Sequence, residues 1–450
     1  MCPATDWPQN AAKEKRQLGH PSTLPPVNPT GLDTVPSTDS TAGPPPRIAP
    51  DVWAVSTTSL FSDWSYEMVL GILPFFLVFV LGATPFLVGV VNGLADFAQS
   101  GVQRFAGGAW AQGPGRRLRG AYGYAATTVG HGLIALAVLW PEVLVFRIAA
   151  WTGRGSRQPV KKAIIANATS PRTQGLAFGL EQAMDSLGAV LGTATAIVLV
   201  LYEGVSVFRS IFALSVVPGA VAVMVWLVFV KDRNARNAPS GPSRRTIAWS
   251  ALPPWFRLFL VAEAVFGLGY FSILLALLRV GEDLLPSLGG SLSEVVVAAL
   301  LLYLLYNLLY TGMSYPAGKW ADRSPDVRLV ALSFLLFAVV DVLLLGYGGL
   351  IAAVLAFVAA GVQVGLQGVT ESAWVGRRMP GASAAPAFGW LGFVQGFAVL
   401  GGSVLAGALW TFVSAPLAFG VSAVLSVSGA ALLLPLLLPG WEPPVSTSTL

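Results

Sequence analysis

The chain has 450 residues, of which 54% are hydrophobic and 11% charged, with a mean hydropathy of +0.68 and a formal net charge of +5. Soluble domains usually carry about 25% charged residues, so this composition excludes an ordinary water-soluble fold. Its apolar runs are about twenty residues long, whereas an outer-membrane barrel shows alternating segments of roughly ten. The composition therefore predicts an all-α integral membrane protein, because helices satisfy their own backbone polar groups in lipid.

Residues 1–52 are rich in Pro, Ser, Thr and Gly and contain no apolar run. This composition is typical of disordered segments, and we expect a cytoplasmic tail. A cleavable signal peptide needs an apolar stretch after a basic start, and none precedes Trp53. The first span is therefore expected to remain in the protein.

Twelve apolar windows follow the tail, each near the roughly 20 residues that a bilayer requires. They lie at 57–81, 85–109, 119–139, 142–166, 176–201, 206–230, 256–279, 292–316, 328–346, 350–375, 386–410 and 415–438. The polar stretch 231–255 separates six windows from six. We therefore expect six-helix bundles at 53–230 and 256–440, joined by a cytoplasmic linker at 231–255 and followed by a cytoplasmic tail at 441–450.

The basic residues are distributed unevenly between the two sides. If the tail is cytoplasmic, nineteen of the 27 Lys and Arg lie on inner connections or inner helix ends, against Arg209 and Arg279 on the outer side. The nineteen include Arg154, Arg157 and Lys161. This asymmetry is the positive-inside pattern of membrane proteins. It predicts a multi-pass protein of the plasma membrane with both termini cytoplasmic, and an even number of spans agrees with twelve.

Three short matches recur at one offset of 210 residues. Gly108-Ala-Trp-Ala is followed by Gly318-Lys-Trp-Ala, Ala177-Phe-Gly by Ala387-Phe-Gly, and Gly192 by Gly402. A single offset indicates an internal duplication, which many transporter folds contain. Because six spans is an even number, the two halves are expected to be parallel repeats.

Two loops resemble the loop motif of the major facilitator superfamily, Gly-x-x-x-Asp-Arg-x-Gly-Arg/Lys-Arg/Lys. The chain reads GAWAQGPGRR after the second window and GKWADRSPDVR after the eighth. The resemblance implies a cytoplasmic gate in which the glycines allow close helix contact. The residues that match it are Gly108, Gly115, Arg116, Arg117, Gly318, Asp322 and Arg323, while Gln112 and Gly113 replace the Asp-Arg pair of the first copy.

Three longer stretches, SLFSDWSYEMVLGILPFFLVFVLGA, RIAAWTGRGSRQPVKKAIIA and GLAFGLEQAMDSLGAVLG, resemble a prokaryotic subgroup of uncharacterised and efflux-type permeases in the same superfamily. The chain departs from that subgroup near Ala150, where an acid is expected, and at Lys161 and Lys162, where an Arg-Asp pair is expected. The resemblance implies twelve transmembrane helices in two bundles, a central cavity and alternating access.

Four acids lie within spans of the first half. Asp63 and Glu67 are four residues apart in the first window, and Glu181 and Asp185 repeat that spacing in the fifth. Residues four apart share one helix face, and charges at membrane depth cost several kcal/mol, so these acids are candidates for proton or cation coupling. For Asp63 and Glu181, nearer the inner surface, gate or packing contacts are the favoured alternative.

Arg147 is the only base well inside the fourth window. It can bind an anionic group bidentately or neutralise an acid. A buried structural pair of Glu67 or Asp185 with Arg104 or Arg147 therefore remains an alternative to coupling. For His131 and the other acids within spans, hydrogen-bonded contacts between helices are the favoured reading; these acids are Asp96, Asp341, Glu263 and Glu371.

Cysteine and histidine are too scarce for a metal centre, since only Cys2, His20 and His131 are present. The chain also lacks the phosphate-binding loop of ATP-driven pumps. We therefore expect no cofactor, no metal, no nucleic-acid partner and no enzyme activity.

The leading hypothesis is a monomeric secondary transporter that exports a small molecule in exchange for protons. One alternative is uptake of an organic anion or a sugar, with Arg147 holding the cargo. Another is a receptor or scaffold with the major facilitator fold that does not transport and binds a partner through residues 1–52.

Overall fold

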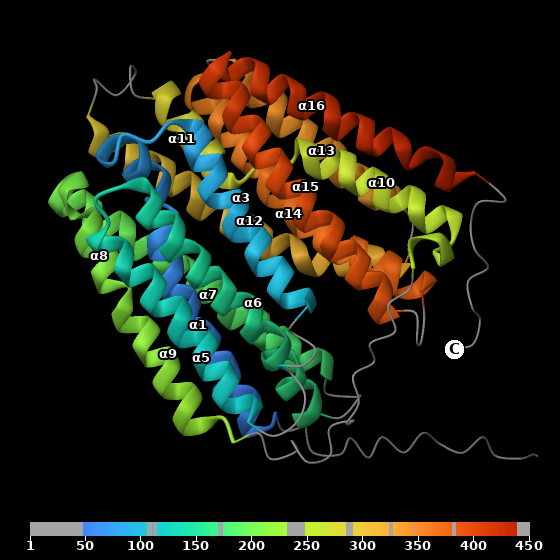
Figure 1. The fold of residues 1–450 in the computed structure, drawn as a ribbon, viewed down its shortest axis with the longest axis horizontal. Helices are drawn as coiled ribbons and strands as arrows, with labels where there is room; N and C mark the ends of the chain where they lie inside the picture. Colours follow the sequence, from blue (N-terminus) through green and yellow to red (C-terminus); the bar gives the residue numbers. More distant parts are fainter. Residues whose placement is uncertain are drawn as a thin grey trace, which may run out of the picture. The chain divides into compact units, whose positions relative to one another are not determined.

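The computed structural model describes residues 48–105, 110, 115–169, 174–231, 248–284, 291–323, 327–346, 348–379 and 384–438. From residue 47 onward the chain forms one compact unit. Its regular elements within the described ranges are all helical. The described helices form two bundles, which Figure 1 shows in blue to green and in yellow to red.

The first bundle contains six membrane crossings, three of which are built from more than one helical piece. Their elements are α1 (Pro50–Leu70) with α2 (Leu73–Phe75) and the π-helical turn Phe76–Val80, α3 (Pro85–Phe105), α5 (Arg116–Leu133) with the turn Ile134–Leu136, α6 (Trp140–Ala168), α7 (Gln174–Glu203), and α8 (Phe208–Leu214) with α9 (Val216–Phe229).

The second bundle repeats this order. Its elements are α10 (Pro254–Gly269) with α11 (Ile273–Leu284), α12 (Leu292–Arg323), α13 (Val327–Leu345), α14 (Gly349–Arg378), α15 (Ala384–Phe412) and α16 (Ala415–Leu432) with the turn Leu434–Leu437. Short helical turns also lie at Gly204–Val207 and Trp249–Ala251. The twelve predicted windows are therefore helical, and the fold class is confirmed.

Eight segments in the described part of the chain are long and apolar enough to cross a membrane on their own composition. One of them, Leu176–Phe229, contains α7, α8 and α9 and therefore makes two crossings. Helices α3, α5 and α6 are absent from this set because they carry more polar and charged residues. Several of their charged side chains, such as Arg116, Arg147 and Lys161, are buried against other helices, as described below.

The ends of several helices follow local sequence signals. Pro50 occupies the first turn of α1, where a missing N–H leaves no donor unused. The Glu142 side chain accepts hydrogen bonds from the backbone at the start of α6, at 2.7 Å from Val138 N and 3.2 Å from Leu139 N. Ser414 caps α16 by accepting from Leu417 N.

Glycines bring the fifth and first crossings of each bundle together. A Cβ on Gly188 or Gly192 of α7 would stand 2.3 Å from Leu60 O or 2.6 Å from Trp64 O of α1. A Cβ on Gly402 of α15 would stand 2.5 Å from Gly267 O of α10. The repeat between Gly192 and Gly402 is thus a repeat of structure, because both positions exclude a side chain for the same reason.

The two bundles contact each other mainly through α3 with α15 and α7 with α12. We call the end where α1 begins the basic end, because it carries Arg116, Arg117 and Arg323, and the other the far end. At the far end a Cβ on Gly281 of α11 would lie 2.7 Å from Phe75 Cε1 of α2, and α3 packs along α15. Within the described residues, α6 and α14 make no extensive contact with each other.

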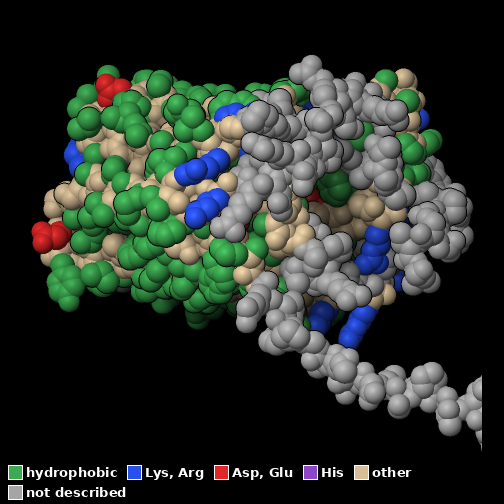
Figure 2. Space-filling view, turned by 90° about the horizontal axis from the view of Figure 1, so that it is seen from below, with side chains coloured by type: hydrophobic (Ala, Val, Ile, Leu, Met, Phe, Trp, Pro, Cys, Tyr) green, Lys and Arg blue, Asp and Glu red, His purple; other side chains and the backbone are tan. Residues whose placement is uncertain are grey.

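The described surface is strongly apolar. Large hydrophobic side chains are exposed along the helices, including Ile351 at 76% and Phe412 at 74%. Figure 2 shows hydrophobic side chains over much of the described surface on one face. An exposed apolar surface of this kind is what contact with lipid chains requires.

Candidate functional site

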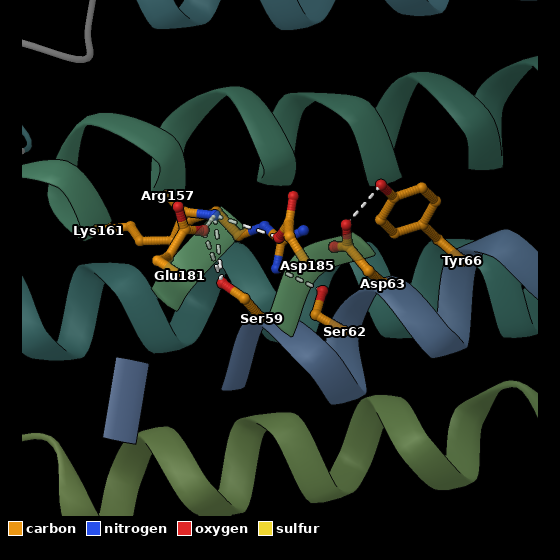
Figure 3. A network of polar contacts seen from close by, with 8 residues as sticks. All are labelled: Ser59, Ser62, Asp63, Tyr66, Arg157, Lys161, Glu181 and Asp185. Carbon is orange, nitrogen blue, oxygen red and sulfur yellow. Dashed lines mark hydrogen bonds and ion pairs between the residues drawn. The ribbon is translucent and has the colours of Figure 1, made fainter. Parts of the chain in front are cut away.

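A buried ion cluster lies between α6 and α7 and reaches α1. The Lys161 ammonium forms an ion pair with Glu181, lies 3.5 Å from Asp185 Oδ1 and donates to Ser59 Oγ at 3.2 Å. Ser59 Oγ in turn donates to Glu181 Oε1 at 3.1 Å. Figure 3 shows these groups around the Lys161 amine. Because Lys161 is only 5% exposed, its charge is balanced by protein carboxylates.

The same cluster continues along α1 (Figure 3). Arg157 Nη1 donates to Ser62 Oγ at 2.5 Å, and the Tyr66 hydroxyl donates to Asp63 Oδ2 at 2.9 Å. Asp63 and Asp185 are close enough to repel each other electrostatically. Three acids, counting Glu181, and two bases, Arg157 and Lys161, therefore interact in one largely buried layer.

A third base of α6, Arg154, connects this cluster to Glu67. Its guanidinium stacks over the Tyr66 ring at 4.2 Å and attracts the carboxylates of Asp63, Glu67 and Asp185. Arg154, Arg157 and Lys161 are spaced three and four residues apart, which places them on one face of α6.

Glu67 links the two bundles. Its Oε2 accepts a hydrogen bond of 2.8 Å from the Tyr303 hydroxyl of α12, and the carboxyl is 7% exposed. A Cβ on Gly71, one turn further along the chain, would lie 2.4 Å from Leu300 Cδ2 of α12. Protonation of Glu67 can therefore alter the contact between the bundles, because it changes the group to which the Tyr303 hydroxyl donates its hydrogen bond.

Arg147 is enclosed by its own bundle. It donates to Asn92 Oδ1 at 3.1 Å, lies 3.5 Å from His131 Nε2 and stacks on Trp151 at 3.8 Å, with 2% exposure. The Trp151 indole donates to Asp96 Oδ1 at 2.7 Å. The contacts of Arg147 are thus with an amide and aromatic rings, so the alternative in which it pairs with Glu67 or Asp185 is wrong.

Arg104 likewise contacts aromatic rings rather than Glu67 or Asp185. Its guanidinium lies over the rings of Phe105, Trp390 and Phe393 at 5.7 to 5.9 Å. It therefore contributes to the α3–α15 contact between the bundles, and the alternative in which it pairs with Glu67 or Asp185 is wrong. The structure gives those two acids Tyr303 and Lys161 instead.

A second polar cluster lies in the other bundle. Gln395 Nε2 of α15 donates to Glu371 Oε2 at 2.8 Å and to Glu263 Oε2 at 3.2 Å. Both carboxyls are buried, at 5% and 1% exposure. They line a cavity of about 530 Å³ together with Phe266, Tyr270, Tyr310, Gln182 and Gln367 among others.

The first copy of the loop motif ties α5 to α9. Gly115 precedes α5 with a φ of 81°, which only glycine adopts without strain. Arg117 donates to Leu227 O near the end of α9, and the Trp226 indole donates to Arg117 O at 2.7 Å. Arg116 is 1% exposed, and its guanidinium faces Asn167 of α6. The basic residues thus hold helices within one bundle.

The remaining motif residues are less constrained. Gly108 lies outside the described residues, as does the side chain of Asp322. A Cβ on Gly318 would meet only Val369 Cγ1 at 4.0 Å, and Arg323 is exposed. The expectation that Gly318 permits a close helix contact is therefore wrong in this conformation, since the space around it is open.

Reasoning from the sequence misses several residues of these clusters. It groups Arg154, Arg157 and Lys161 with the inner helix ends, but α6 continues to Ala168 and buries Arg157 and Lys161. Their spacing on one helix face is the available signal. The sequence gives no comparable signal for Tyr303 or Gln395, because a Tyr or Gln within a span is common and its partner is known only from the structure.

Asp341 fits the expected contact between helices. Its Oδ2 accepts a hydrogen bond of 2.8 Å from Ser422 Oγ, which joins α13 to α16. Within the described ranges, no three His, Cys, Asp or Glu side chains are grouped as a metal site would require.

Comparison with known proteins agrees with this architecture. The family profile described as Major Facilitator Superfamily matches residues 55–300. An uncharacterised MFS-type transporter of Methanocaldococcus jannaschii is 28% identical over 395 residues, which are 86% of this chain and 95% of the relative. The multidrug resistance protein MdtH of Photorhabdus laumondii is 24% identical over 290 residues, or 60% and 67% of the two chains.

A crystal structure of a mutant of the nucleoside transporter NupG has the same fold, with a TM-score of 0.70 at 13% identity, over 85% of this chain and 99% of that one. The profile match covers more than half of the 450 residues and coincides with the helices that hold the Lys161 cluster and Glu67. The chain therefore belongs to the major facilitator superfamily of membrane transporters.

Proposed function

We propose that this protein is a secondary active transporter that exports a small molecule in exchange for protons by alternating access. The observation that carries the proposal is the hydrogen bond between Glu67 and Tyr303. It places a buried acid of one bundle on the contact that closes the far end against the other bundle. A proton on Glu67 would therefore change the stability of that contact, which is what coupling requires.

The basic end is proposed to be cytoplasmic, since positively charged ends of spans are retained on that side. The cavity supports an inward-open state. Its lining residues Gln182, Glu263, Ser314 and Glu371 all lie in the basic-end parts of their helices, while Phe75 and Gly281 close the far end. Protons that enter from the far end in the opposite state would reach Glu67 first.

The ion cluster around Lys161 supplies a second element for coupling. Lys161 shares its charge between Glu181 and Asp185, while Asp185 also acts on Asp63. Protonation of one acid would leave a cation in excess, so neighbouring pairs would rearrange. We assign Asp63, Glu67, Glu181 and Asp185 to coupling, and Arg154, Arg157 and Lys161 to balancing these acids.

Export rather than uptake is supported by the similarity to a multidrug resistance protein. Uptake of an organic anion would use Arg147, but that guanidinium already contacts Asn92, His131 and Trp151. The Arg147 side chain is also absent from the lining of the cavity described above. We therefore assign Arg147 to packing of α3, α5 and α6.

The test is transport by the full chain in proteoliposomes that contain a pH-sensitive dye. Pools of small molecules are screened for flux with and without an imposed proton gradient. Cargo-dependent proton movement is expected in the wild type and lost in Glu67→Gln, whereas the exposed control Glu203→Gln should keep it.

Flux that ignores the proton gradient would overturn proton coupling. Absence of flux for every pool would favour a scaffold, and deletion of residues 1–50 then tests whether a partner binds through them. A transporter should keep its flux after the same deletion.

A further inference from the structure

We propose that the cavity described above, which the second bundle lines together with Gln182 of the first, binds an organic cation through Glu263 and Glu371. This inference rests on the proposed function and deepens it by naming the class of cargo. Glu263 Oε1 and Glu371 Oε1 are buried at the cavity and find no hydrogen-bond donor among the described groups. Gln395 Nε2, which donates to both acids, contacts their other oxygens. Both residues line the cavity, and no ion pair with Lys or Arg is formed by either acid within the described residues, so two buried carboxyl groups lie in the wall of the space that a ligand would fill.

The internal repeat shows that the cation of the first-bundle cluster, Lys161, has no equivalent beside Glu263. At the offset of 210 residues, Lys161 corresponds to Glu371 and Asp185 corresponds to Gln395. The backbone supports this equivalence, because a Cβ on Gly155 of α6 would lie 2.4 Å from Gln99 O of α3, and one on Gly365 of α14 would lie 2.8 Å from Tyr310 O of α12. The two clusters therefore occupy related places in the two bundles.

The positive charges of the first bundle have no counterparts at these related places. Arg154, Arg157 and Lys161 of α6 balance the acids of the first bundle, and their counterparts in α14 are Val364, Gln367 and Glu371. All three counterparts line the cavity. Within the described part of the chain, the polar groups that act on Glu263 are the side chains of Glu371 and Gln395, neither of which is a base. A cationic ligand would supply the charge that Lys161 supplies in the first bundle.

The rest of the lining fits an amphipathic cation. Phe266, Tyr270 and Tyr310 present aromatic rings, which attract cations through their faces. Gln182 and Gln367 add amide groups. A volume of about 530 Å³ is within the range of sites for drug-sized ligands. The chemistry that these walls recognise is therefore an aryl or alkyl group carrying a quaternary or protonated amine.

The test is direct binding, which needs no transport. Radiolabelled tetraphenylphosphonium is added to the purified full chain in lipid nanodiscs. Benzyltrimethylammonium should displace the probe, while its uncharged isostere neopentylbenzene should not. Glu371→Gln and Glu263→Gln should each weaken probe binding about tenfold or more, because a buried charge pair is lost. The exposed acid control Glu203→Gln should bind like the wild type.

A second variant keeps the test decisive if the amide variants are unstable. Glu371→Lys places an amine at the position that corresponds to Lys161, where it can pair with Glu263. This variant should remain folded, as judged by gel filtration, and lose probe binding.

Equal binding by Glu371→Lys and the wild type, equal displacement by the uncharged isostere, or no probe binding at millimolar concentration would each overturn the cation assignment. Proton-coupled flux of a neutral or anionic cargo in the liposome assay would then leave the proposed transport function standing.

Discussion

The Tyr303 hydroxyl of α12 donates a 2.8 Å hydrogen bond to the Glu67 carboxylate of α1, between residues that are 236 positions apart in the chain. Both side chains are buried, and Leu300 packs against Gly71 one turn away. The bond thus lies inside the contact between the bundles, so its loss should affect the balance between the two conformations.

Replacing Tyr303 with Phe should loosen the far end. The substitution removes one buried hydrogen bond to an acid, worth about 1–3 kcal/mol, so the ratio of the open to the closed far end should rise by about fivefold to a hundredfold. Cys2 is the only cysteine, so a Cys2→Ser chain with Leu300→Cys reports this through the reaction of its introduced thiol with an impermeant maleimide.

Tyr306→Phe is the matched control for this experiment, because the Tyr306 ring stacks on Tyr303 while the bond to Glu67 comes from Tyr303. Labelling of the introduced thiol should keep its original rate in this control. A Tyr303→Phe rate no higher than that of Tyr306→Phe would show that the bond does not hold the far end closed.

A methyl group at Gly281 should also disturb the far end. In Gly281→Ala the new Cβ would lie 2.7 Å from Phe75 Cε1, which is closer than side-chain carbons pack. Overpacking of this kind costs about 1–3 kcal/mol. Hydrogen exchange of residues 73–80 and 273–284 should become faster, while Gly312→Ala, with no atom within 4 Å of its Cβ, should leave it unchanged.

Loss of the Lys161 amine should destabilise the first bundle. Lys161→Met leaves Glu181 and Asp185 buried without their nearest cation, and breaking a buried ion pair costs about 3–5 kcal/mol. Thermal unfolding in detergent measures the effect. The adjacent and exposed Lys162 provides a control, since Lys162→Met removes the same charge and leaves both ion pairs of Lys161 intact.

The double variant Lys161→Met with Glu181→Gln separates charge from packing. It removes an acid together with the amine, so it should recover part of the lost stability. No recovery would mean that the Lys161 side chain acts through packing alone.

Replacing a closely packed glycine of α7 or α15 with Ala should lower the stability of the protein by a similar amount in each bundle. A Cβ at Gly192 would lie 2.6 Å from Trp64 O, and one at Gly402 would lie 2.5 Å from Gly267 O. Backbone atoms cannot move aside easily, so each Ala variant should lose about 1–3 kcal/mol. Gly179→Ala has open space and should unfold like the wild type. Equal stability of all three variants would contradict this account of the packing.

Helices can be predicted well because hydrophobicity over about twenty residues depends only on local sequence. The windows at 142–166 and 350–375 correspond to α6 and α14 within a few residues. The duplication can also be recognised from the sequence, and Gly192 and Gly402 have the same packing role in the structure. Features that repeat along the chain, or persist over a whole helix, need no knowledge of spatial neighbours.

Charge partners cannot be predicted in the same way. The spacing identifies four acids of the first bundle, but it offers Arg104 and Arg147 as their partners where the structure places Lys161, Arg154 and Tyr303. A helix can rotate about its axis without changing its hydrophobic pattern. Which buried base faces which acid therefore depends on that rotation, and on contacts between distant helices.

Composition and spacing along one chain are enough to derive the number of crossings, the twofold repeat and the four acids within the spans of the first bundle. They leave open how α6 balances the acids of its bundle while α14 brings Glu371 to a cavity beside Glu263, which follows from the packed helices alone. This division arises because the energy of a buried charge depends on its nearest neighbours in space. Those neighbours are set by the packing of helices that lie far apart in the chain.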